Sequence, residues 1–409
     1  MMKCGLLGRH LSHSYSPQIH RMLGDYSYEL FEKEPEELEA FLKSDSWDGL
    51  NVTVPYKKAV IPFLNQLTPI AQRLGAVNTI IRREGKLIGH NTDYAGFQAL
   101  LDSLDLSVDS LKVLVLGSGG AASTASAVLT DRGARVVVIS RSGGDNYENL
   151  HLHQDARLIV NTTPVGMYPD NGASPLPCAA IRQLFPQLEG VVDVIYNPAR
   201  TKLLLDCEKA GCTVSTNGLL MLVAQAKEAA QWFTGKTISD DVVRQITRKL
   251  NEQMQNLILI GMPGCGKTTV GQLLAQRTGR KFVDSDAEIC ALAGKSIPDI
   301  FSHDGHETFR DLETRVLSDL GKQSGLVIAT GGGCVTKARN YDLLHQNGII
   351  FRLQRDIEKL PTEGRPLSTD LTQMQRIREP FYDAFQDRII DNDATPEEAV
   401  EQILQFLEV

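Results

Sequence analysis

Two glycine-rich loops carry the residue types that hold nucleotides, and each stands between an apolar run and a helix-like segment. The later loop, residues 261–268, reads GMPGCGKT and fits the pattern G-x-x-x-x-G-K-T. In this pattern the backbone N–H groups cradle phosphate oxygens, the lysine bridges the terminal phosphates and the threonine hydroxyl faces Mg²⁺. We therefore expect a nucleoside triphosphate here, in contact with Gly261, Gly264, Cys265, Gly266, Lys267, Thr268 and Thr269.

The earlier loop, residues 117–122, reads GSGGAA and fits G-x-G-x-x-A, a weaker pattern that favours a dinucleotide. Its first glycine permits a tight turn, the second lets the backbone approach a pyrophosphate, and the small Ala122 lets helix pack on strand. The next strand ends at Arg141, where enzymes that prefer NAD place an acidic residue. A guanidinium suits a 2′-phosphate, so we expect NADP(H); the alternative is that Arg141 merely ends a strand at the surface. The expected contacts are Gly117, Gly119, Gly120, Ala121, Ala122, Ser140 and Arg141.

Four polar clusters lie in the first hundred residues. By itself each is typical of a turn or a helix cap; Ser16, for example, fits a helix N-cap with Pro17 at the first helical position. Together they offer hydroxyls, amides, one lysine and one carboxylate, which suits a small polyhydroxylated acid. The clusters are SYSP at 14–17, NVTVPYK at 51–57, GAVNT at 75–79 and NTD at 91–93.

Charged residues and glycines also follow the later loop. Asp284 and Asp286 end the next predicted strand, two residues apart on one face, where Asp284 could support the magnesium shell and Asp286 could orient an acceptor hydroxyl. The alternative is a helix N-cap followed by first-turn acids. Arg310 and Glu313 share a helical face, which by itself is typical of a solvated salt bridge. Three glycines at 331–333 follow an apolar strand and suggest backbone packed against a ligand.

The elements that must position these residues alternate between β and α type along the whole chain. This alternation predicts an α/β fold with mainly parallel sheets. The expected strands are CGLLG, GLNVTV, KVLVLG, RVVVIS, RLIVNTT, GVVDVIY, LILIGM, LVIATGG and IIFRL, and the expected helices include Glu36–Leu42, Tyr94–Leu104, Ala121–Asp131, Lys202–Ala210 and Val270–Gln276.

The length of 409 residues suggests two to four domains, at roughly 100–200 residues each. Residues 236–255 are polar, with apolar side chains at helical spacing, and we interpret them as a helix bridging two halves, with the boundary near 250–256. We expect residues 1–100 with a returning helix at 216–250 to bind substrate, residues 101–215 to form a Rossmann domain, and residues 251–409 to form a P-loop domain with a parallel sheet.

The composition limits the classes of partner. The net charge is -8 and no basic block stands out, so we expect neither nucleic acid nor a membrane as a partner. No run of 18 apolar residues and no signal peptide is visible. The seven cysteines are dispersed; the closest pair, Cys207 and Cys212, does not have zinc-site spacing. Free thiols favour a cytoplasmic protein.

The ordered motifs of the first half resemble shikimate dehydrogenase: S-x-S-P, N-V-T-x-P-x-K, G-A-V-N-T, N-T-D-x-x-G, then N-x-T-P-x-G-M at 161–167, D-x-x-Y-x-P at 193–198 and the closing helix from Gly218. The family's further basic residues beside the nucleotide are replaced by Thr124 and by glycines 143–144. The resemblance, over about residues 3–235, implies a catalytic pair of Lys57 and Asp93, for which the alternative is a surface ion pair. It implies substrate contacts from Ser14, Ser16, Thr53, Asn78, Asp93, Tyr196 and Gln225, and a cofactor contact from Gly218.

The second half, over about residues 256–409, resembles shikimate kinase through its phosphate loop, D-x-D, F-R-x-x-E, G-G-G, R-P-L and R-x-P-x-Y. The resemblance implies that Asp286, Arg310, Gly332, Gly333 and Arg378 bind shikimate and that Arg365, on a mobile lid, neutralises the transferred phosphate. Lys267 and Asp286 join Arg365 as expected catalytic residues, and Thr268 with Asp284 as magnesium ligands. The lid is shorter here than is usual in the family.

These features predict a bifunctional enzyme of aromatic amino-acid biosynthesis. Its first half would reduce 3-dehydroshikimate to shikimate with NADPH, and its second half would phosphorylate shikimate with ATP and Mg²⁺ to shikimate 3-phosphate. Three alternatives stay open: one half catalytic and the other a sensing or scaffolding module, a dehydrogenase that also oxidises quinate, and a non-enzymatic regulator. The sequence leaves the oligomeric state unknown.

Overall fold

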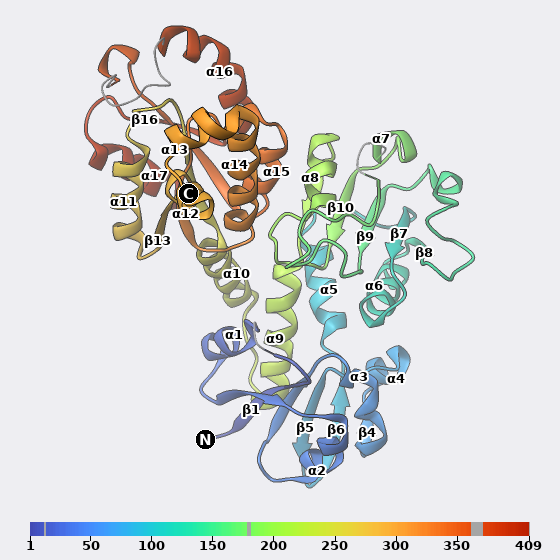
Figure 1. Cartoon of the computed structure of the whole chain (residues 1–409). Coiled ribbons are helices and arrows are strands. Elements are labelled where there is room, and N and C mark those ends of the chain that lie inside the picture. The colour runs from blue at the N-terminus through green and yellow to red at the C-terminus, as the bar shows by residue number, and fades with distance from the viewer. Residues whose placement is uncertain (12–13, 178–180, 361–370, 409) are drawn as a thin grey trace. The chain divides into compact units, whose positions relative to one another are not determined.

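The computed structural model describes residues 1–408 apart from 12–13, 178–180 and 361–370. The chain folds into two compact units (Figure 1). The first unit comprises residues 1–165, 174–196 and 206–250, and the second comprises residues 166–173, 197–205 and 251–409. The predicted lid residue Arg365 lies outside the described residues.

The first unit begins with a six-stranded sheet in the order β2-β1-β3-β5-β6-β4. β5 runs antiparallel to both of its neighbours, β3 and β6, whereas the other pairs are parallel. The strands are β1 (Lys3–Gly8), β2 (Ser27–Glu32), β3 (Gly49–Val52), β4 (Gln66–Leu67), β5 (Thr79–Arg83) and β6 (Lys86–His90), and the helices are α1 (Ser16–Leu23), α2 (Leu38–Lys43), α3 (Tyr56–Ala59) and α4 (Pro69–Leu74).

The second sheet of this unit has five strands in the order β11-β10-β9-β7-β8, and every pair is parallel. Helix α9 returns to pack against α1 and α5. The strands are β7 (Lys112–Leu116), β8 (Arg135–Ile139), β9 (Leu158–Asn161), β10 (Gly190–Asp193) and β11 (Val214–Thr216), and the helices are α5 (Asp93–Asp102), α6 (Gly120–Asp131), α7 (Ile181–Leu184), α8 (Lys202–Lys209) and α9 (Leu219–Thr234). The first turn of α8, residues 202–205, is assigned to the second unit.

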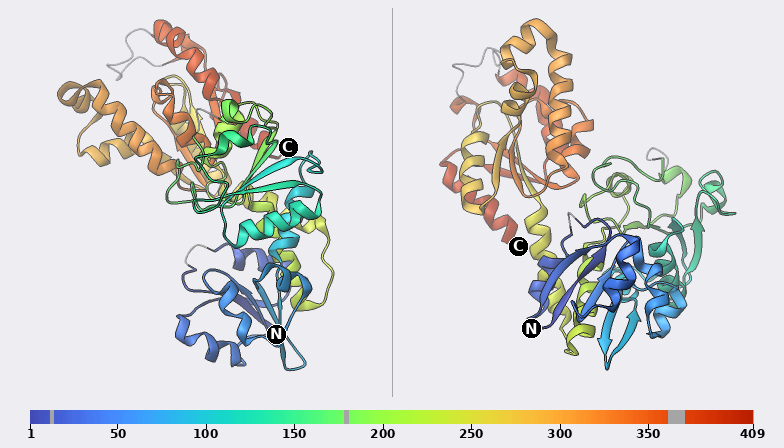
Figure 2. Two further views of the ribbon diagram at one scale, coloured as in Figure 1. Left: turned by 90° about the vertical axis from the view of Figure 1, so that its right-hand side faces the viewer. Right: turned by 60° about the horizontal axis from the view of Figure 1, so that its bottom comes forward.

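The second unit holds a five-stranded parallel sheet in the order β13-β14-β12-β15-β16. The right-hand view of Figure 2 shows its strands with helices on both sides. The strands are β12 (Asn256–Ile260), β13 (Lys281–Asp284), β14 (Leu326–Ala329), β15 (Gly348–Gln354) and β16 (Arg388–Asp391), and the helices are α11 (Lys267–Thr278), α12 (Ser285–Ala293), α13 (Ile297–Asp299), α14 (Gly305–Gly321), α15 (Arg339–His345), α16 (Leu371–Phe385) and α17 (Pro396–Glu408).

The central strands explain why the sequence forms these sheets. β12 reads NLILI and β14 reads LVIA, and every residue of both is buried. Parallel strands that carry helices on both faces are apolar on both faces, so continuous apolar runs rather than alternating ones are expected. The predicted α/β class with mainly parallel sheets is confirmed.

The predicted bridging helix is present as α10 (Asp240–Met254). The alternative interpretation of Ser16 as a helix N-cap is wrong. Ser16 is not the N-cap of α1 but its first residue; the cap position is Tyr15, which has helical backbone angles. The Ser14 hydroxyl instead accepts a hydrogen bond from the Ser16 N–H at 3.2 Å, which satisfies one of the free donors at the helix start.

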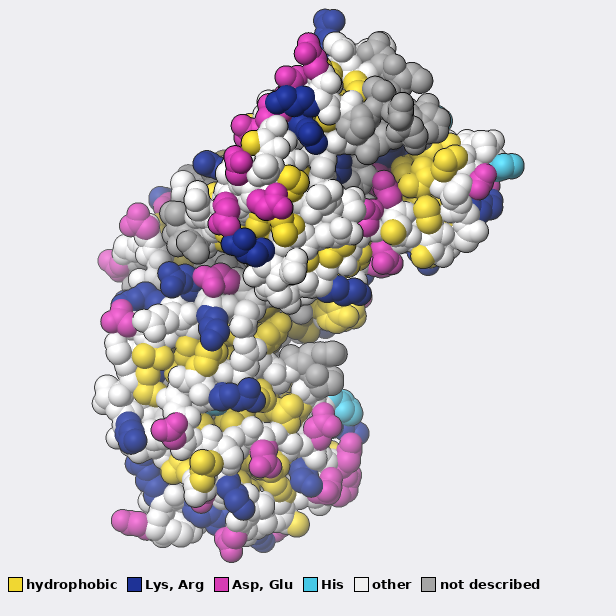
Figure 3. Space-filling model, turned by 90° about the vertical axis from the view of Figure 1, so that its left-hand side faces the viewer, with side chains coloured by type: hydrophobic (Ala, Val, Ile, Leu, Met, Phe, Trp, Pro, Cys, Tyr) yellow, Lys and Arg dark blue, Asp and Glu magenta, His cyan; other side chains and the backbone are white. Residues whose placement is uncertain are grey.

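Charged side chains of both signs are interspersed on the face of the molecule drawn in Figure 3. Within the described part of the chain, no helix is both long enough and apolar enough to cross a bilayer.

Candidate active sites

In the first unit, the antiparallel β5 collects polar residues from distant parts of the sequence at one edge of the sheet. Asn51 pairs with Thr79, and Thr79 pairs with His90, so the start of β5 lies beside the ends of β3 and β6. The segments that carry Lys57 and Asp93 follow those two strand ends. The topology therefore brings the stretch before β5, the turn after β3 and the N-terminus of α5 together.

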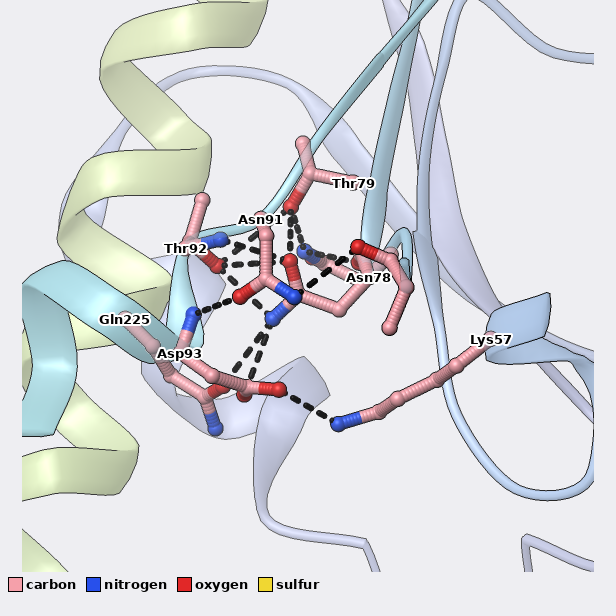
Figure 4. A network of polar contacts seen from close by, with 9 residues as sticks. Lys57, Asn78, Thr79, Asn91, Thr92, Asp93 and Gln225 are labelled. Atoms are coloured by element: carbon pink, nitrogen blue, oxygen red, sulfur yellow. Dashed lines mark hydrogen bonds and ion pairs between the residues drawn. The ribbon is translucent and has the colours of Figure 1, made fainter. Parts of the chain in front are cut away.

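Asn78 is the centre of the resulting hydrogen-bond network (Figure 4). Its side chain is buried, and its Nδ2 donates to Asp93 Oδ1 at 2.9 Å, to Thr92 Oγ1 at 3.0 Å and to Gln225 Oε1 at 3.4 Å. Its Oδ1 accepts the Thr92 backbone N–H at 2.7 Å. Gln225 comes from α9, and α9 approaches α5 closely because Gly96 leaves no side chain between them. The network fixes one oxygen of Asp93.

The other oxygen of Asp93 faces Lys57. The Lys57 Nζ lies 2.7 Å from Asp93 Oδ2, with 30% of the lysine side chain and 9% of the aspartate side chain exposed. The alternative of a surface ion pair does not fit, because the carboxylate is withdrawn from solvent. A buried carboxylate beside a partly exposed ammonium is suited to hold that ammonium in a fixed direction.

Four further predicted substrate residues are held by other contacts. The Ser16 hydroxyl hydrogen-bonds to Tyr28, and the Thr53 N–H donates to the Leu7 carbonyl at 2.9 Å. The ring centroids of Tyr196 and Tyr15 lie 6.1 Å apart in an edge-to-face arrangement, and burial raises the pKa of the Tyr196 phenol. The structure thus joins Lys57, Asn78, Asp93 and Gln225 directly, and anchors Ser14, Ser16, Thr53 and Tyr196 separately.

The earlier glycine loop connects β7 to α6 as predicted. Gly117 has φ +111°, and a Cβ there would meet Thr162 at 2.9 Å, so both backbone and space require glycine. Gly119 and Gly120 face open space, and the first turn of α6 has no side-chain cap. Open N–H groups at a helix N-terminus are suited to an anionic pyrophosphate. Ala122 is buried against the strands, as a small third residue should be.

Arg141 follows β8 and is exposed, while Ser140 is buried and its N–H donates to the Asp145 carbonyl at 3.1 Å. Thr124 is also buried, so a side chain at this position does not point to the surface where a nucleotide would bind. The neighbouring Ser123 is the exposed residue on this turn. Gly218 precedes α9, and a Cβ there would collide with the Val194 backbone, so packing alone explains this glycine.

The later loop connects β12 to α11. Gly266 has φ +95° and is the cap position of α11, which again has no side-chain cap. Lys267 lies over the loop, with its Nζ 2.9 Å from the Gly261 carbonyl and 3.0 Å from the Met262 carbonyl. The Cys265 side chain is buried in the core, so the predicted contact of this residue with a phosphate can come only from its backbone.

Asp284 links this loop to the next helix. Its Oδ2 accepts the Thr268 hydroxyl at 2.9 Å, and its Oδ1 accepts the Asp286 N–H at 3.0 Å. The prediction that both carboxylates end the strand is wrong, because β13 ends at Asp284 and Asp286 lies in the first turn of α12. Asp284 is thus the N-cap of α12, as the alternative interpretation has it. It also accepts a hydrogen bond from the Thr268 hydroxyl, which is expected to face magnesium.

A cavity of about 650 Å³ opens beside the loop. Asp286 Oδ1 and Glu313 Oε1 are buried there and, among the described residues, have no hydrogen-bond partner. Burial, reinforced for Asp286 by Asp284, raises the pKa of both carboxyls. Two unsatisfied carboxylate oxygens in one cavity indicate a ligand that donates hydrogen bonds, such as a hydroxylated molecule. The lining includes Lys267, Thr268, Thr269, Asp284, Asp286, Arg310, Glu313, Gly331, Gly332, Gly333, Arg355 and Arg378.

Two arginines meet the triple glycine in this cavity. Arg310 Nη1 lies 2.6 Å from Glu313 Oε2, and Glu313 is fully buried, so the alternative of a solvated salt bridge does not fit. A Cβ at Gly333 would collide with the Arg310 guanidinium. The Gly332 carbonyl accepts Arg378 Nη1 at 3.1 Å. Gly333 thus lets the Arg310 guanidinium come close to the backbone, whereas the lack of a side chain at Gly332 makes room for Pro263.

Comparison with known proteins identifies the first part of the chain. Residues 6–80 match the family model described as shikimate dehydrogenase substrate binding domain. A shikimate dehydrogenase (NADP(+)) of Oleidesulfovibrio alaskensis is 39% identical over 257 residues, which cover 57% of this chain and 90% of that protein. The chain belongs to the shikimate dehydrogenase family. A shikimate 5-dehydrogenase of Thermus thermophilus, solved in complex with NADP(H) and shikimate, is 33% identical with a TM-score of 0.54 and covers 61% of this chain and 99% of its own.

The second part of the chain carries a different domain. Residues 263–408 match the family model described as shikimate kinase. One chain therefore joins dehydrogenase and kinase domains of the shikimate pathway, and both resemblances are confirmed. Fusion has a parallel: a chorismate mutase/shikimate 5-dehydrogenase fusion protein from Clostridium acetobutylicum is 32% identical, with a TM-score of 0.58, and covers 62% of this chain and 98% of its own.

Sequence reasoning missed several residues that organise these sites. In the dehydrogenase domain, Asn51 Nδ2 donates to Thr79 Oγ1 at 3.1 Å and so supports the Asn78 network; the polar cluster at residues 51–57 contains Asn51, but gave it no role of its own. In the kinase domain, the Tyr382 hydroxyl donates to the Gly332 carbonyl at 2.6 Å. Its spacing of four residues from Arg378 places both on one helical face and could have indicated a shared partner.

Proposed function

We propose that this chain reduces 3-dehydroshikimate to shikimate with NADPH and then phosphorylates shikimate with ATP to shikimate 3-phosphate. The observation that carries the proposal is the presence of two chemically different sites. One is a Lys57–Asp93 pair tied to Asn78, and the other is a phosphate-loop cavity with two unsatisfied carboxylate oxygens among the described residues. The two domains would use different cofactors because the two steps are a reduction and a phosphoryl transfer.

In the dehydrogenase domain, the open loop at residues 117–122 fits a pyrophosphate, and bound NADPH would supply hydride to the ring ketone. The Lys57 ammonium would stabilise the developing alkoxide and donate its proton. Asp93 would keep Lys57 oriented, and Asn78 would hold Asp93 in turn. The exposed Arg141 would receive the 2′-phosphate of NADP(H), with Ser140 and Gly218 near the cofactor.

The substrate of this domain would be bound through its carboxylate and hydroxyls. We assign these contacts to Ser14, Ser16, Thr53, Asn78, Asp93, Tyr196 and Gln225. The Ser14 and Ser16 pair supports this assignment, because the bond from the Ser16 N–H to the Ser14 hydroxyl holds the two hydroxyl-bearing residues at the start of α1. Gln225 is supported by its hydrogen bond to Asn78 at 3.4 Å, which aims its amide at the network.

In the kinase domain, Lys267 and the loop amides would hold the phosphates of ATP. Thr268 and Asp284 offer hard oxygen donors that suit Mg²⁺, which would neutralise phosphate charge when bound. Asp286 would orient the acceptor hydroxyl and receive its proton, with Gly332 and Gly333 lining the shikimate site. Arg310 and Arg378 would bind the shikimate carboxylate. Arg365 is proposed to neutralise the transferring phosphate and lies outside the described residues.

The domain limits and the cellular location belong to the same proposal. Two separate sheets in the first unit support a substrate domain of residues 1–100 with 216–250 and a Rossmann domain of residues 101–215, followed by a kinase domain of residues 251–409. A cytoplasmic location is supported by the described cysteines, all six of which are free thiols.

Separate assays of the full chain test both activities. Reduction of 3-dehydroshikimate should be measured with NADPH and with NADH, and phosphorylation of added shikimate with ATP and Mg²⁺. We expect both reactions, with NADPH preferred. Quinate oxidation faster than shikimate oxidation would contradict the substrate assignment, and absence of one reaction would reduce that domain to a binding module.

A further inference from the structure

The C-terminal end of α8 holds two cysteines in contact through its capping motif. Gly211 has φ +73° and its N–H donates to the Glu208 carbonyl at 2.9 Å. The Cys212 N–H donates to the Cys207 carbonyl at 3.1 Å. These two bonds form a Schellman motif, which commonly brings the side chains at the positions of Cys207 and Cys212 into apolar contact. Here that contact joins two thiols.

The two thiols have different surroundings. Cys207 is fully buried, whereas Cys212 is partly exposed. The Cys207 thiol donates to the Val214 carbonyl at 3.9 Å and is also within hydrogen-bonding reach of the Cys212 sulfur, while the Cys212 thiol donates to the Leu188 carbonyl at 3.9 Å. The Arg182 guanidinium lies beside the turn, where it donates to the Ala210 carbonyl at 2.7 Å and to the Gly211 carbonyl at 3.0 Å. The hydrogen bond from Cys207, followed by the charge of Arg182, lowers the pKa of Cys212 to about 7.

The pKa of Cys207 moves in the opposite direction. Its role as hydrogen-bond donor, its burial and the nearby negative charge of Glu208 all raise it. The pair therefore combines an accessible thiolate at neutral pH with a protected thiol next to it. Redox-sensitive cysteines have this arrangement, an accessible sulfur of low pKa beside a resolving cysteine.

We propose that Cys207 and Cys212 form a hydroperoxide-reactive dithiol that closes to a disulfide. The Cys212 thiolate attacks one oxygen of hydrogen peroxide, the O–O bond breaks, and the departing hydroxide takes a proton to become water. The Cys207 sulfur then attacks the sulfenic sulfur of Cys212, the S–O bond breaks, and the hydroxide leaves with the Cys207 proton as a second water. Two thiols are oxidised to one disulfide while one peroxide is reduced to two waters.

The turn already holds the two cysteines next to each other. One backbone hydrogen bond joins Cys207 to Cys212, at the two positions whose side chains this capping motif brings into contact. The site is independent of the proposed active-site residues, and its test does not depend on either catalytic assignment.

Other thiols of the chain provide the comparison. Burial raises the pKa of Cys4 and of Cys334 to about 12, so neither forms a thiolate at neutral pH. Cys290 is partly exposed, as Cys212 is, and it stands in the kinase domain without a described cysteine partner. Cys290 is therefore the matched control for exposure.

The test treats the reduced full chain with hydrogen peroxide at neutral pH, blocks remaining thiols by alkylation, and analyses the peptides by mass spectrometry. We expect the peptide with Cys207 and Cys212 to lose the mass of two hydrogens, and to regain both thiols with dithiothreitol. In Cys207→Ser, Cys212 should stop at sulfenic acid, which a dimedone probe captures. Cys290→Ser should oxidise at the 207–212 pair like the wild type.

Two results would overturn the proposal. One is full alkylation of both Cys207 and Cys212 after peroxide has already oxidised Cys290. The other is a dimedone adduct on Cys212 in the wild type as stable as in Cys207→Ser, because that would mean that Cys207 does not resolve it.

Discussion

Lys57 Nζ lies 2.7 Å from Asp93 Oδ2, and the lysine side chain is more exposed than that of the aspartate. The second oxygen of Asp93 is bonded to Asn78 at 2.9 Å, so the carboxylate has little freedom to turn. The ammonium has three donors and uses one of them on Asp93. It can direct the others to a substrate oxygen, which is the arrangement that proton donation to a ketone requires.

Lys57→Met should abolish most reduction of 3-dehydroshikimate, because it removes the proton donor and the charge that stabilises the alkoxide. General acid catalysis contributes about 10²–10⁴-fold, so kcat should fall by that range. Phosphorylation of added shikimate should be unchanged. Lys58→Met is the matched control, since Lys58 is the exposed neighbour on the same helix. Equal losses in both variants would remove Lys57 from the chemistry.

Asn78→Ala should damage both reduction and stability. The buried Thr92 N–H would lose its acceptor at 2.7 Å and Asp93 would lose a donor. An unsatisfied buried group costs about 1–3 kcal/mol, which urea unfolding of the full chain should detect. The kcat for reduction should also fall when it is measured at a temperature where the variant is fully folded, so that unfolding does not account for the loss. Unchanged kcat would mean that the network does not orient Asp93.

Arg141→Ala should weaken NADPH much more than NADH. A charge-assisted hydrogen bond contributes about 1.5–3 kcal/mol, which predicts an increase of roughly 10- to 100-fold in KM for NADPH. Arg135→Ala, at the opposite end of β8, is the control and should leave both values unchanged. If KM for NADPH does not change in Arg141→Ala, the 2′-phosphate binds elsewhere.

Asp286→Asn should inactivate the kinase and stabilise the fold at neutral pH. The folded pKa of Asp286 is raised by burial. Between the ordinary aspartate pKa of about 3.9 and the raised pKa of folded Asp286, the unfolded chain loses the proton more readily than the folded chain. The free energy of unfolding therefore falls as pH rises through this range, because the folded chain must then hold a buried charge. The variant should therefore gain stability at pH 8 and gain less at pH 5, by urea unfolding. Glu288→Gln, exposed on the same helix, should gain nothing.

The same raised pKa predicts the pH profile of the wild-type kinase. If the carboxylate form of Asp286 receives the proton, kcat should decline as pH decreases, with a midpoint above the ordinary aspartate value of about 3.9. A profile that stays flat down to that value would argue against Asp286 as the base.

Arg352 links the kinase sheet to α16. It is buried, and it lies 2.6 Å from Glu379 and 2.9 Å from Asp383, two residues on the helix that carries Arg378. Arg352→Met should raise KM for shikimate because α16 loses this anchor. It should also lower the free energy of unfolding, but by less than the about 3–5 kcal/mol that breaking a fully buried pair costs, since Glu379 and Asp383 are 40% and 56% exposed. Arg376→Met, on the same helix, is the control. Equal KM values in both variants would contradict an anchoring role.

Patterns local in sequence could be predicted. Both glycine loops were found because strand, turn and helix follow one another within a few residues, and their phosphate-binding logic depends on the backbone of that stretch alone. The bridging helix was found from the spacing of its apolar residues and is observed at Asp240–Met254. Whether a charged pair is buried or exposed is harder to predict from spacing. Arg310 and Glu313 have the spacing of an exposed helical ion pair, yet Glu313 is fully buried.

Contacts between distant segments could not be predicted from the residues alone. The meeting of Asn78 with Gln225 crosses 147 positions and depends on α9 returning to the first sheet. The antiparallel direction of β5, which brings Asn78 beside Asp93, has no unambiguous signal in a five-residue strand. The contact of Cys207 with Cys212 required the turn at Gly211, whereas spacing alone only excluded zinc.

The most direct test of two consecutive active sites is one reaction mixture of the full chain with 3-dehydroshikimate, NADPH, ATP and Mg²⁺, followed by mass spectrometry of the products. The wild type should form shikimate 3-phosphate, Lys57→Met should leave 3-dehydroshikimate unreacted, and Lys267→Ala should accumulate shikimate. Accumulation of shikimate by the wild type, with ATP unconsumed, would contradict the proposal that both sites are active.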